Sequence, residues 1–176
     1  MKLAVVLVLV CSTAHADKPK PCWAPELEQL AFWVGDWDAS WPGQKGQPVQ
    51  HGHNRIERIL DGCGFQEHFT GTDGFVGTSI SSWGPRTGWR QTWIDNQAAF
   101  MDFTGGEQGG GPDGKTFIFA RETTKPDGTK IKQRMVFKNI TKDAFDWSWE
   151  SSTDGKSWTV SWPIHYVRTA SPRPAK

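Results

Sequence analysis

The sequence lacks a charge excess of either sign. Its 20 lysines and arginines balance 19 aspartates and glutamates, which gives a formal net charge of +1 at pH 7. Without a basic or acidic excess, there is no electrostatic reason to expect binding to nucleic acid or to an anionic membrane. The longest apolar run, residues 3–10, is far shorter than the roughly 20 residues of a bilayer-spanning helix. No membrane span is therefore expected.

Cysteine is scarce as well, with three in the chain. Cys11 lies in a segment that processing is expected to remove, which leaves Cys22 and Cys63. These two lack the C-x-x-C spacing of a redox pair, and in an exported chain such a pair is expected to form a disulfide. Closing a loop of this length would stabilise the fold by roughly 3 to 4 kcal/mol in the chain-entropy model.

The N-terminus has the three parts of a secretory signal peptide. Lys2 supplies the positive start, the apolar run follows, and Ala14-His15-Ala16 fits a small-residue cleavage site. We therefore expect cleavage after Ala16 and export to the periplasm or the extracellular space. The expected segments are a signal peptide over residues 1–16, an extended N-terminal stretch over 17–24, one barrel domain over 25–170 and a C-terminal tail over 171–176.

Alternation of apolar and polar residues dominates the chain after a short helix predicted over residues 25–32. Turn signals, mostly Asp-Gly pairs, separate the alternating segments at even spacing. This pattern predicts an all-β fold, a single antiparallel up-and-down barrel of about ten strands whose closure removes exposed edges. A glycine-rich loop is predicted over residues 105–114. The predicted strands lie near residues 33–40, 49–60, 63–70, 75–84, 88–95, 98–104, 115–123, 129–138, 144–151 and 157–168.

The Asp61-Gly62 turn allows the register of one hairpin to be predicted. A two-residue turn there puts one set of cross-strand pairs on the more apolar face. Arg58 and Glu67 then lie diagonally across the ladder, near enough for an ion pair. The predicted pairs are Leu60 with Cys63, Arg58 with Phe65, and Ile56 with Glu67.

Aromatic residues are abundant and skewed towards indole, with 11 tryptophans, ten phenylalanines and one tyrosine. Strand alternation places most of these tryptophans on one face of their strands. If that face is interior, indoles line the barrel with a few polar groups among them. The residues on this face are Trp89, Gln91, Trp93 and Asp95 on one strand, Phe145, Trp147 and Trp149 on another, and Trp158, Val160, Trp162, Ile164, Tyr166 and Arg168 on the last.

Polar residues at inward positions carry most of the functional information, because burying a charge or an amide without a partner costs several kcal/mol. One interpretation is a ligand cavity, in which these groups orient a polar end while tryptophans stack on an apolar body. The alternative is an internal hydrogen-bond network that fills a narrow barrel. The residues concerned are Arg58, Glu67, Gln91, Asp95 and Gln133.

The histidines give little support for a metal or haem site. His51, His53 and His68 lie close together on an outward face, but Arg55 lies beside them and no obvious carboxylate completes a ligand set. His165 has outward parity on the last strand, which disfavours haem ligation. We therefore expect no metal and no other cofactor.

Catalysis also has limited support. Glu67 and Asp95 are the carboxylates available for acid–base chemistry, although nothing in the sequence fixes their separation. Ser79 and Ser81 lack the strand-turn-helix context of a catalytic nucleophile, and their small size is expected to leave room inside a barrel. The sequence favours a binding protein over an enzyme.

Several motifs rich in Trp, Gly and Asp occur in order along the chain. They are Phe32-Trp33-Val34-Gly35-Asp36-Trp37, Arg58-Ile59-Leu60-Asp61-Gly62-Cys63 with Glu67, Trp89-Arg90-Gln91-Thr92-Trp93-Ile94-Asp95-Asn96, Trp149-Glu150-Ser151-Ser152 with Asp154-Gly155 and Ser157-Trp158, and Tyr166-Val167-Arg168. As a set they resemble the secreted bacterial family grouped as domain of unknown function 1579. The resemblance implies a barrel similar to those of lipocalins and other calycins.

The resemblance also implies roles for particular residues. In calycins a Gly-x-Trp on the first strand packs against an Arg on the last, which here gives structural roles to Gly35, Trp37 and Arg168. The family is more distantly similar to the haem-binding nitrobindin barrels, whose proximal His has no clear inward counterpart in this chain. The resemblance leaves the activity open, because a fold does not fix a function.

Together these features predict an exported barrel that binds a small hydrophobic or amphipathic molecule. The alternatives are an enzyme that acts on a small metabolite through interior carboxylates, a haem-binding nitrobindin-like barrel, and a purely structural or partner-binding barrel. The residues expected to stack on the ligand are Trp33, Trp89, Trp93 and Trp149. Those expected to orient its polar end are Arg58, Glu67, Gln91 and Asp95.

Overall fold

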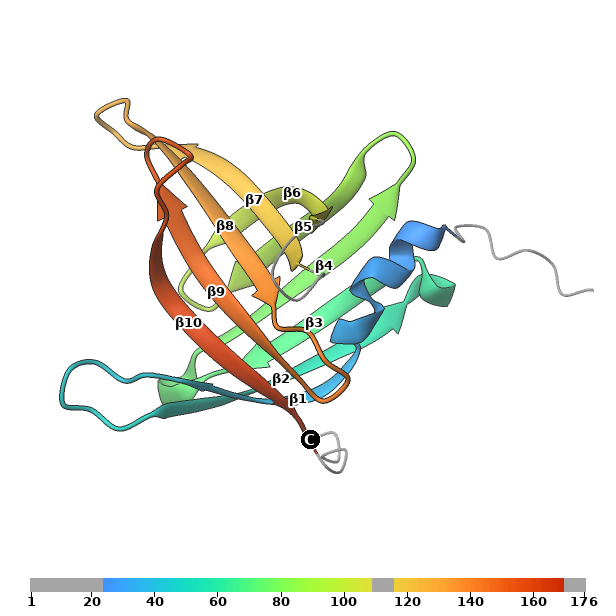
Figure 1. Ribbon diagram of the computed structural model, residues 1–176, viewed down its shortest axis with the longest axis horizontal. Helices are drawn as coiled ribbons and strands as arrows, with labels where there is room; N and C mark the ends of the chain where they lie inside the picture. The colour runs from blue at the N-terminus through green and yellow to red at the C-terminus, as the bar shows by residue number, and fades with distance from the viewer. Residues whose placement is uncertain (1–23, 109–115, 170–176) are drawn as a thin grey trace, which may run out of the picture.

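The computed structural model describes residues 24–108 and 116–169, which form a closed β-barrel (Figure 1). A 3-10 helix, η1 (Pro25–Trp33), precedes ten strands. Each strand pairs with the next in sequence, and β1 closes the barrel against β10. The predicted all-β, antiparallel up-and-down barrel is therefore confirmed. The strands are β1 (Gly35–Trp41), β2 (Gln50–Ile59), β3 (Gly64–Thr70), β4 (Val76–Gly84), β5 (Gly88–Asp95), β6 (Phe100–Gln108), β7 (Thr116–Thr124), β8 (Lys130–Lys138), β9 (Ala144–Ser152) and β10 (Thr159–Arg168).

Some predictions fall outside the described ranges. The signal peptide and Cys22 lie before residue 24, so cleavage and the disulfide between Cys22 and Cys63 stay predictions. Residues 109–114 of the predicted glycine-rich loop lie outside the described ranges as well. Within residues 24–108 and 116–169, no helix is long and apolar enough to cross a membrane.

The start of the predicted glycine-rich loop belongs to β6 instead. Gly105 pairs with Phe119 of β7 and with Trp89 of β5. A Cβ atom at position 105 would lie 1.9 Å from the carbonyl oxygen of Ile118, so the backbones of β6 and β7 approach too closely there for any other residue. Glycine at this point marks a close strand contact and not a loop.

The Asp61-Gly62 turn confirms most of the predicted register. Arg58 pairs with Phe65, and Ile56 pairs with Glu67, as predicted. The predicted pairing of Leu60 with Cys63 is wrong, because residues Leu60–Gly62 form a short 3-10 turn and the ladder ends one pair earlier. Leu60 and Asp61 adopt positive φ angles of 54° and 55°. A two-residue hairpin turn requires a positive φ only at its own two residues, and Leu60 lies just before them.

Helix η1 fills one end of the barrel. Pro25 occupies its first turn, where a missing N–H is tolerated. Leu27, Leu30 and Trp33 are its buried residues, and the Trp33 ring packs edge-to-face on Phe137 at 5.5 Å between ring centres. Trp33 was predicted to begin the first strand and is instead the last residue of the helix. The barrel therefore has one end filled by apolar side chains.

Arg168 joins the last strand to the first beside this filled end. Its guanidinium carbon lies 4.1 Å from the ring centre of Trp37, which is completely buried. The guanidinium also donates to the backbone carbonyls of Val34 (3.0 Å) and Phe32 (3.4 Å). A Cβ atom at Gly35 would lie 2.2 Å from Arg168 Nη1, and Gly35 has φ of +133°. Arg168 therefore packs against both Gly35 and Trp37.

The predicted inward face of the last strand is wrong at its beginning. A register shift between Val160 and Trp162 breaks the alternation of β10. Val160 is consequently 48% exposed. Trp158 precedes the strand and lies outside the barrel, with the Arg134 guanidinium 3.8 Å from its ring centre. Only from Trp162 onwards do alternate side chains of β10 point inwards.

Candidate ligand-binding cavity

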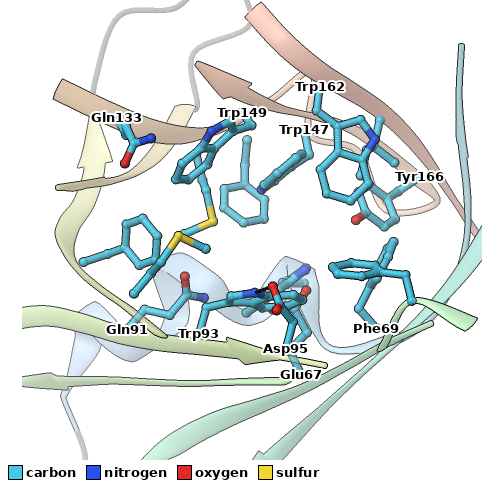
Figure 2. A pocket seen from close by; sticks show the side chains of 17 residues that line it. Glu67, Phe69, Gln91, Trp93, Asp95, Gln133, Trp147, Trp149, Trp162 and Tyr166 are labelled. Atoms are coloured by element: carbon cyan, nitrogen blue, oxygen red, sulfur yellow. Dashed lines mark hydrogen bonds between the residues drawn. The ribbon is translucent and has the colours of Figure 1, made fainter. Parts of the chain in front are cut away.

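A cavity of about 330 Å³ lies inside the barrel, beyond the side chains that fill its helical end. Its wall is formed mainly by side chains from β3, β5 and β6 and from β8 to β10 (Figure 2). The lining residues are Trp33, Glu67, Phe69, Phe75, Gln91, Trp93, Asp95, Met101, Phe103, Gln133, Met135, Phe137, Trp147, Trp149, Trp162, Ile164 and Tyr166. The cavity volume is at the lower end of the range typical of small-molecule sites.

Aromatic rings form opposite sides of this cavity. Figure 2 shows Trp147, Trp149 and Trp162 along one side, with Trp93 and Phe69 facing them. The rings of Trp147 and Trp162 meet edge-to-face at 5.6 Å between centres, and those of Phe69 and Trp162 do so at 5.9 Å. Edge-to-face packing of this kind fixes each ring against its neighbour. The indole faces that remain therefore form a preorganised apolar surface.

A network of polar side chains crosses the β2 to β5 wall. The Asn54 amide donates to Glu67 Oε1 at 2.7 Å, and the Ser79 hydroxyl donates to Glu67 Oε2 at 2.7 Å. The Gln91 amide donates to the hydroxyl oxygens of Ser79 (3.2 Å) and Ser81 (2.9 Å). All five side chains are buried. The two serines thus connect the larger polar groups to one another.

Two acceptors of this network have no hydrogen-bond partner among the described residues, namely Gln91 Oε1 and Asn54 Oδ1. Figure 2 shows the Gln91 amide at the cavity wall, with its oxygen pointing towards the interior. A buried carbonyl oxygen without a donor costs roughly 1–3 kcal/mol. A ligand that donates a hydrogen bond to Gln91 would recover that energy.

Burial changes the acidity of the network. Removal of Glu67 from water raises its pKa to about 7, and the hydrogen bonds from Ser79 and Asn54 limit this rise. The pKa of Tyr166 is raised well above its usual value by burial, and the nearby charge of Glu67 adds to the effect. Glu67 is therefore a carboxyl group that changes protonation state near neutral pH inside the cavity.

Asp95 contributes a second carboxylate to the same wall but has different surroundings. It accepts hydrogen bonds from the Trp93 indole N–H (2.9 Å) and from the backbone N–H groups of Gln97 (2.9 Å) and Ala99 (3.1 Å). Partial burial opposes its ionisation, but these bonds together outweigh that effect and lower its pKa. Asp95 therefore stays ionised, holding Trp93 in place and capping the turn after β5.

Most of the residues predicted for the ligand site line this cavity. They are Trp33, Glu67, Gln91, Trp93, Asp95 and Trp149. Trp33 reaches it from helix η1 and not from the strand on which it was predicted. These residues lie close together around one cavity. Their binding of a ligand stays a prediction.

Trp89 and Arg58 are placed elsewhere. Trp89 is buried in the filled end, where its indole N–H donates to Gln29 at 2.9 Å and its ring packs on Phe117 at 5.3 Å. Arg58 pairs with Glu28 of helix η1 at 2.8 Å. The predicted ion pair between Arg58 and Glu67 is therefore wrong. Alternation gives the face of a strand on which a side chain lies, but not its depth along the barrel.

The sequence did not predict the other lining residues or the Asn54 of the polar network as part of the site. Asn54 follows the same alternation as Ile56, so its inward position could have been inferred from the hairpin. Tyr166 and Trp162 were placed on the inward face without a role. Phe75 and Met101 lie next to strand ends, where alternation carries little information.

The histidines lie outside the cavity lining. His53 contacts Asp36 at 3.2 Å and Asp38 at 3.7 Å on the barrel exterior. His165 is exposed and pairs with Asp146 at 2.7 Å, so its predicted outward orientation is confirmed. In the described part of the chain, no group of three or more His, Cys, Asp or Glu side chains is arranged to hold a metal ion.

Comparison of the sequence with protein-family models and with curated proteins finds no match. The resemblance of the ordered motifs to a secreted calycin-like family therefore stays a prediction.

Proposed function

We propose that this protein binds a small, largely apolar molecule inside the barrel. The observation that carries the proposal is the cavity of about 330 Å³, which has indole rings on opposite sides and the buried Glu67 and Gln91 in its wall. An apolar or aromatic body would stack between the rings, and a polar end would meet Glu67 and Gln91. The expected export signal would place this activity in the periplasm or outside the cell.

The unpartnered Gln91 oxygen supports a ligand over a purely structural network. A self-contained network would be expected to satisfy its buried groups. Here the donors of Gln91 are used by Ser79 and Ser81, whereas its acceptor has no partner among the described residues. A ligand with a hydroxyl or amine group at that point would complete the network.

A variant that fills the cavity should weaken binding. Met101 lines the cavity, and Met101→Trp places an indole in the space that a ligand would occupy. We expect the affinity for 4-bromobenzyl alcohol, measured by titration calorimetry, to fall by at least about tenfold, which corresponds to about 1.4 kcal/mol. Thermal unfolding of the variant would establish that it is folded.

The matched control is Ile80→Trp. Ile80 lies on β4 and is 52% exposed, so the same indole is added outside the barrel. The affinity of the Ile80→Trp variant for 4-bromobenzyl alcohol should equal that of the wild type. Equal affinity in wild type and Met101→Trp would place binding elsewhere on the molecule and contradict the proposal.

A second candidate function is proton transfer by Glu67. A carboxyl group with pKa of about 7 suits a general acid or base at neutral pH. Asp95 accepts three hydrogen bonds in the turn after β5. Of the two carboxyl groups, Glu67 is therefore the better candidate for proton transfer. This function predicts that Glu67→Gln loses turnover of a small metabolite and stays folded. Retained turnover in that variant would exclude it.

A further inference from the structure

The charges of the cavity wall are all of one sign. Glu67 and Asp95 are the carboxyl groups among the lining residues, and none of the lining residues is Lys, Arg or His. Arg121 of β7 has its guanidinium carbon 5.8 Å from the ring centre of Phe103 and its buried Nη1 without a hydrogen-bond partner among the described residues, but it does not line the cavity. An anionic ligand would therefore meet carboxylates with no opposite charge in the wall.

The aromatic rings add to this preference. The face of an indole ring carries negative charge density and attracts an organic cation, most strongly where water is excluded. Trp93, Trp147, Trp149 and Trp162 all line the cavity. A cation that leaves water loses its hydration. The indole rings replace part of that stabilisation, and a nearby carboxylate replaces the rest.

We propose that the polar end of the ligand is an organic cation, an alkylammonium or quaternary ammonium group placed between the indole rings and Glu67. This inference rests on the proposed binding function and names the ligand class. Asn54 and Ser79 each use one site on the Glu67 carboxylate, and an ionised carboxylate has about four acceptor sites. Glu67 can therefore face a cation without losing its present partners.

Proton linkage gives this inference a distinctive signature. A cation beside Glu67 favours its ionised form, and the groups that face Glu67 are neutral Asn54, Ser79 and Tyr166, with ionised Asp95 on the same wall. Because the pKa of Glu67 is about 7, the affinity for a permanent cation should rise by about tenfold between pH 6 and pH 8. A neutral ligand should show no such rise.

The test compares three probes that share a phenyl ring. Benzyltrimethylammonium and neopentylbenzene have the same shape and differ in the positive charge, and 3-phenylpropanoate carries a negative charge. We expect calorimetry at pH 8 to give at least about tenfold tighter binding of the ammonium probe than of neopentylbenzene. The propanoate should bind more weakly than both.

Two variants identify the group responsible. Glu67→Gln keeps the shape of the side chain, and its amide can accept from Asn54 and donate to the Ser79 oxygen. The ratio of the dissociation constants of neopentylbenzene and the ammonium probe should therefore fall towards one, and its pH dependence should disappear. Glu57→Gln makes the same change on the exterior, where Glu57 pairs with Arg55, and should leave the ratio as it is in the wild type.

The other possible binding results would contradict different parts of the proposal. Equal or tighter binding of neopentylbenzene, or a preference for the propanoate, would overturn the cation inference and leave the binding cavity in place. A cation preference that survives in Glu67→Gln would overturn the role of Glu67. Failure of all three probes to bind would overturn the proposed function itself, and this inference with it.

Discussion

Trp37→Ala is expected to lower the free energy of unfolding by about 3 to 5 kcal/mol, the range for loss of a large buried aromatic side chain. Trp37 is completely buried, and its ring packs edge-to-face on Phe145 at 4.8 Å. Its indole N–H donates to the Trp33 carbonyl at 2.8 Å, and its ring lies under the Arg168 guanidinium. The substitution removes these contacts together and leaves a cavity where η1, β1 and β10 meet.

Urea unfolding followed by circular dichroism would measure the loss. Trp158→Ala is the control, because Trp158 is a partly exposed tryptophan that also stacks with an arginine, Arg134, but lies outside the barrel. Trp158→Ala should lower the free energy of unfolding much less than Trp37→Ala does. A loss below about 1 kcal/mol in Trp37→Ala would show that the contact between Trp37 and Arg168 does not hold the barrel closed.

The stability of the wild type is expected to fall by about 3 kcal/mol, through Glu67 alone, as the pH rises from about 4.5 to about 7. The pKa of Glu67 is raised by burial from its ordinary value of 4.5 to about 7. Between these values the folded state holds a proton that the unfolded state has released. The contribution is therefore fully present below pH 4.5 and is lost as the pH rises through the folded pKa.

The difference between wild type and Glu67→Gln isolates this effect, because the glutamine does not titrate. Asp95 and Asp146 have lowered pKa values, so their contributions are lost as the pH falls below about 4, outside this window. Urea unfolding at a series of pH values should show the wild type losing stability relative to the variant as the pH rises. A constant difference from pH 4.5 to pH 8 would contradict a buried, proton-binding Glu67.

Much of the fold could be predicted because a barrel repeats one simple rule. Alternation and Asp-Gly turns locate strands to within a few residues, and the pairing of Arg58 with Phe65 follows from one turn. The errors occur where the rule is broken locally. The register shift before Trp162 reverses the orientation of Val160, and the close approach of β6 and β7 at Gly105 turns a predicted loop residue into a strand residue.

The candidate site was harder to predict, because it depends on depth inside the barrel. Gln91 and Trp89 share a face of β5, yet Gln91 lines the cavity and Trp89 is packed into the filled end. The position of helix η1 decides which end is filled, and no local pattern gives that position. The acidity of Glu67 likewise depends on Asn54 and Ser79, which come from neighbouring strands.

A crystal structure of the protein soaked with 4-bromobenzyl alcohol would test the central claim most directly. Anomalous scattering locates the bromine atom without reference to the protein side chains. We predict a bromine peak inside the barrel in contact with Trp93 or Trp149, with the hydroxyl group directed towards Gln91 or Glu67. A barrel interior filled by its own side chains, with bromine found only on the outer surface, would contradict the account.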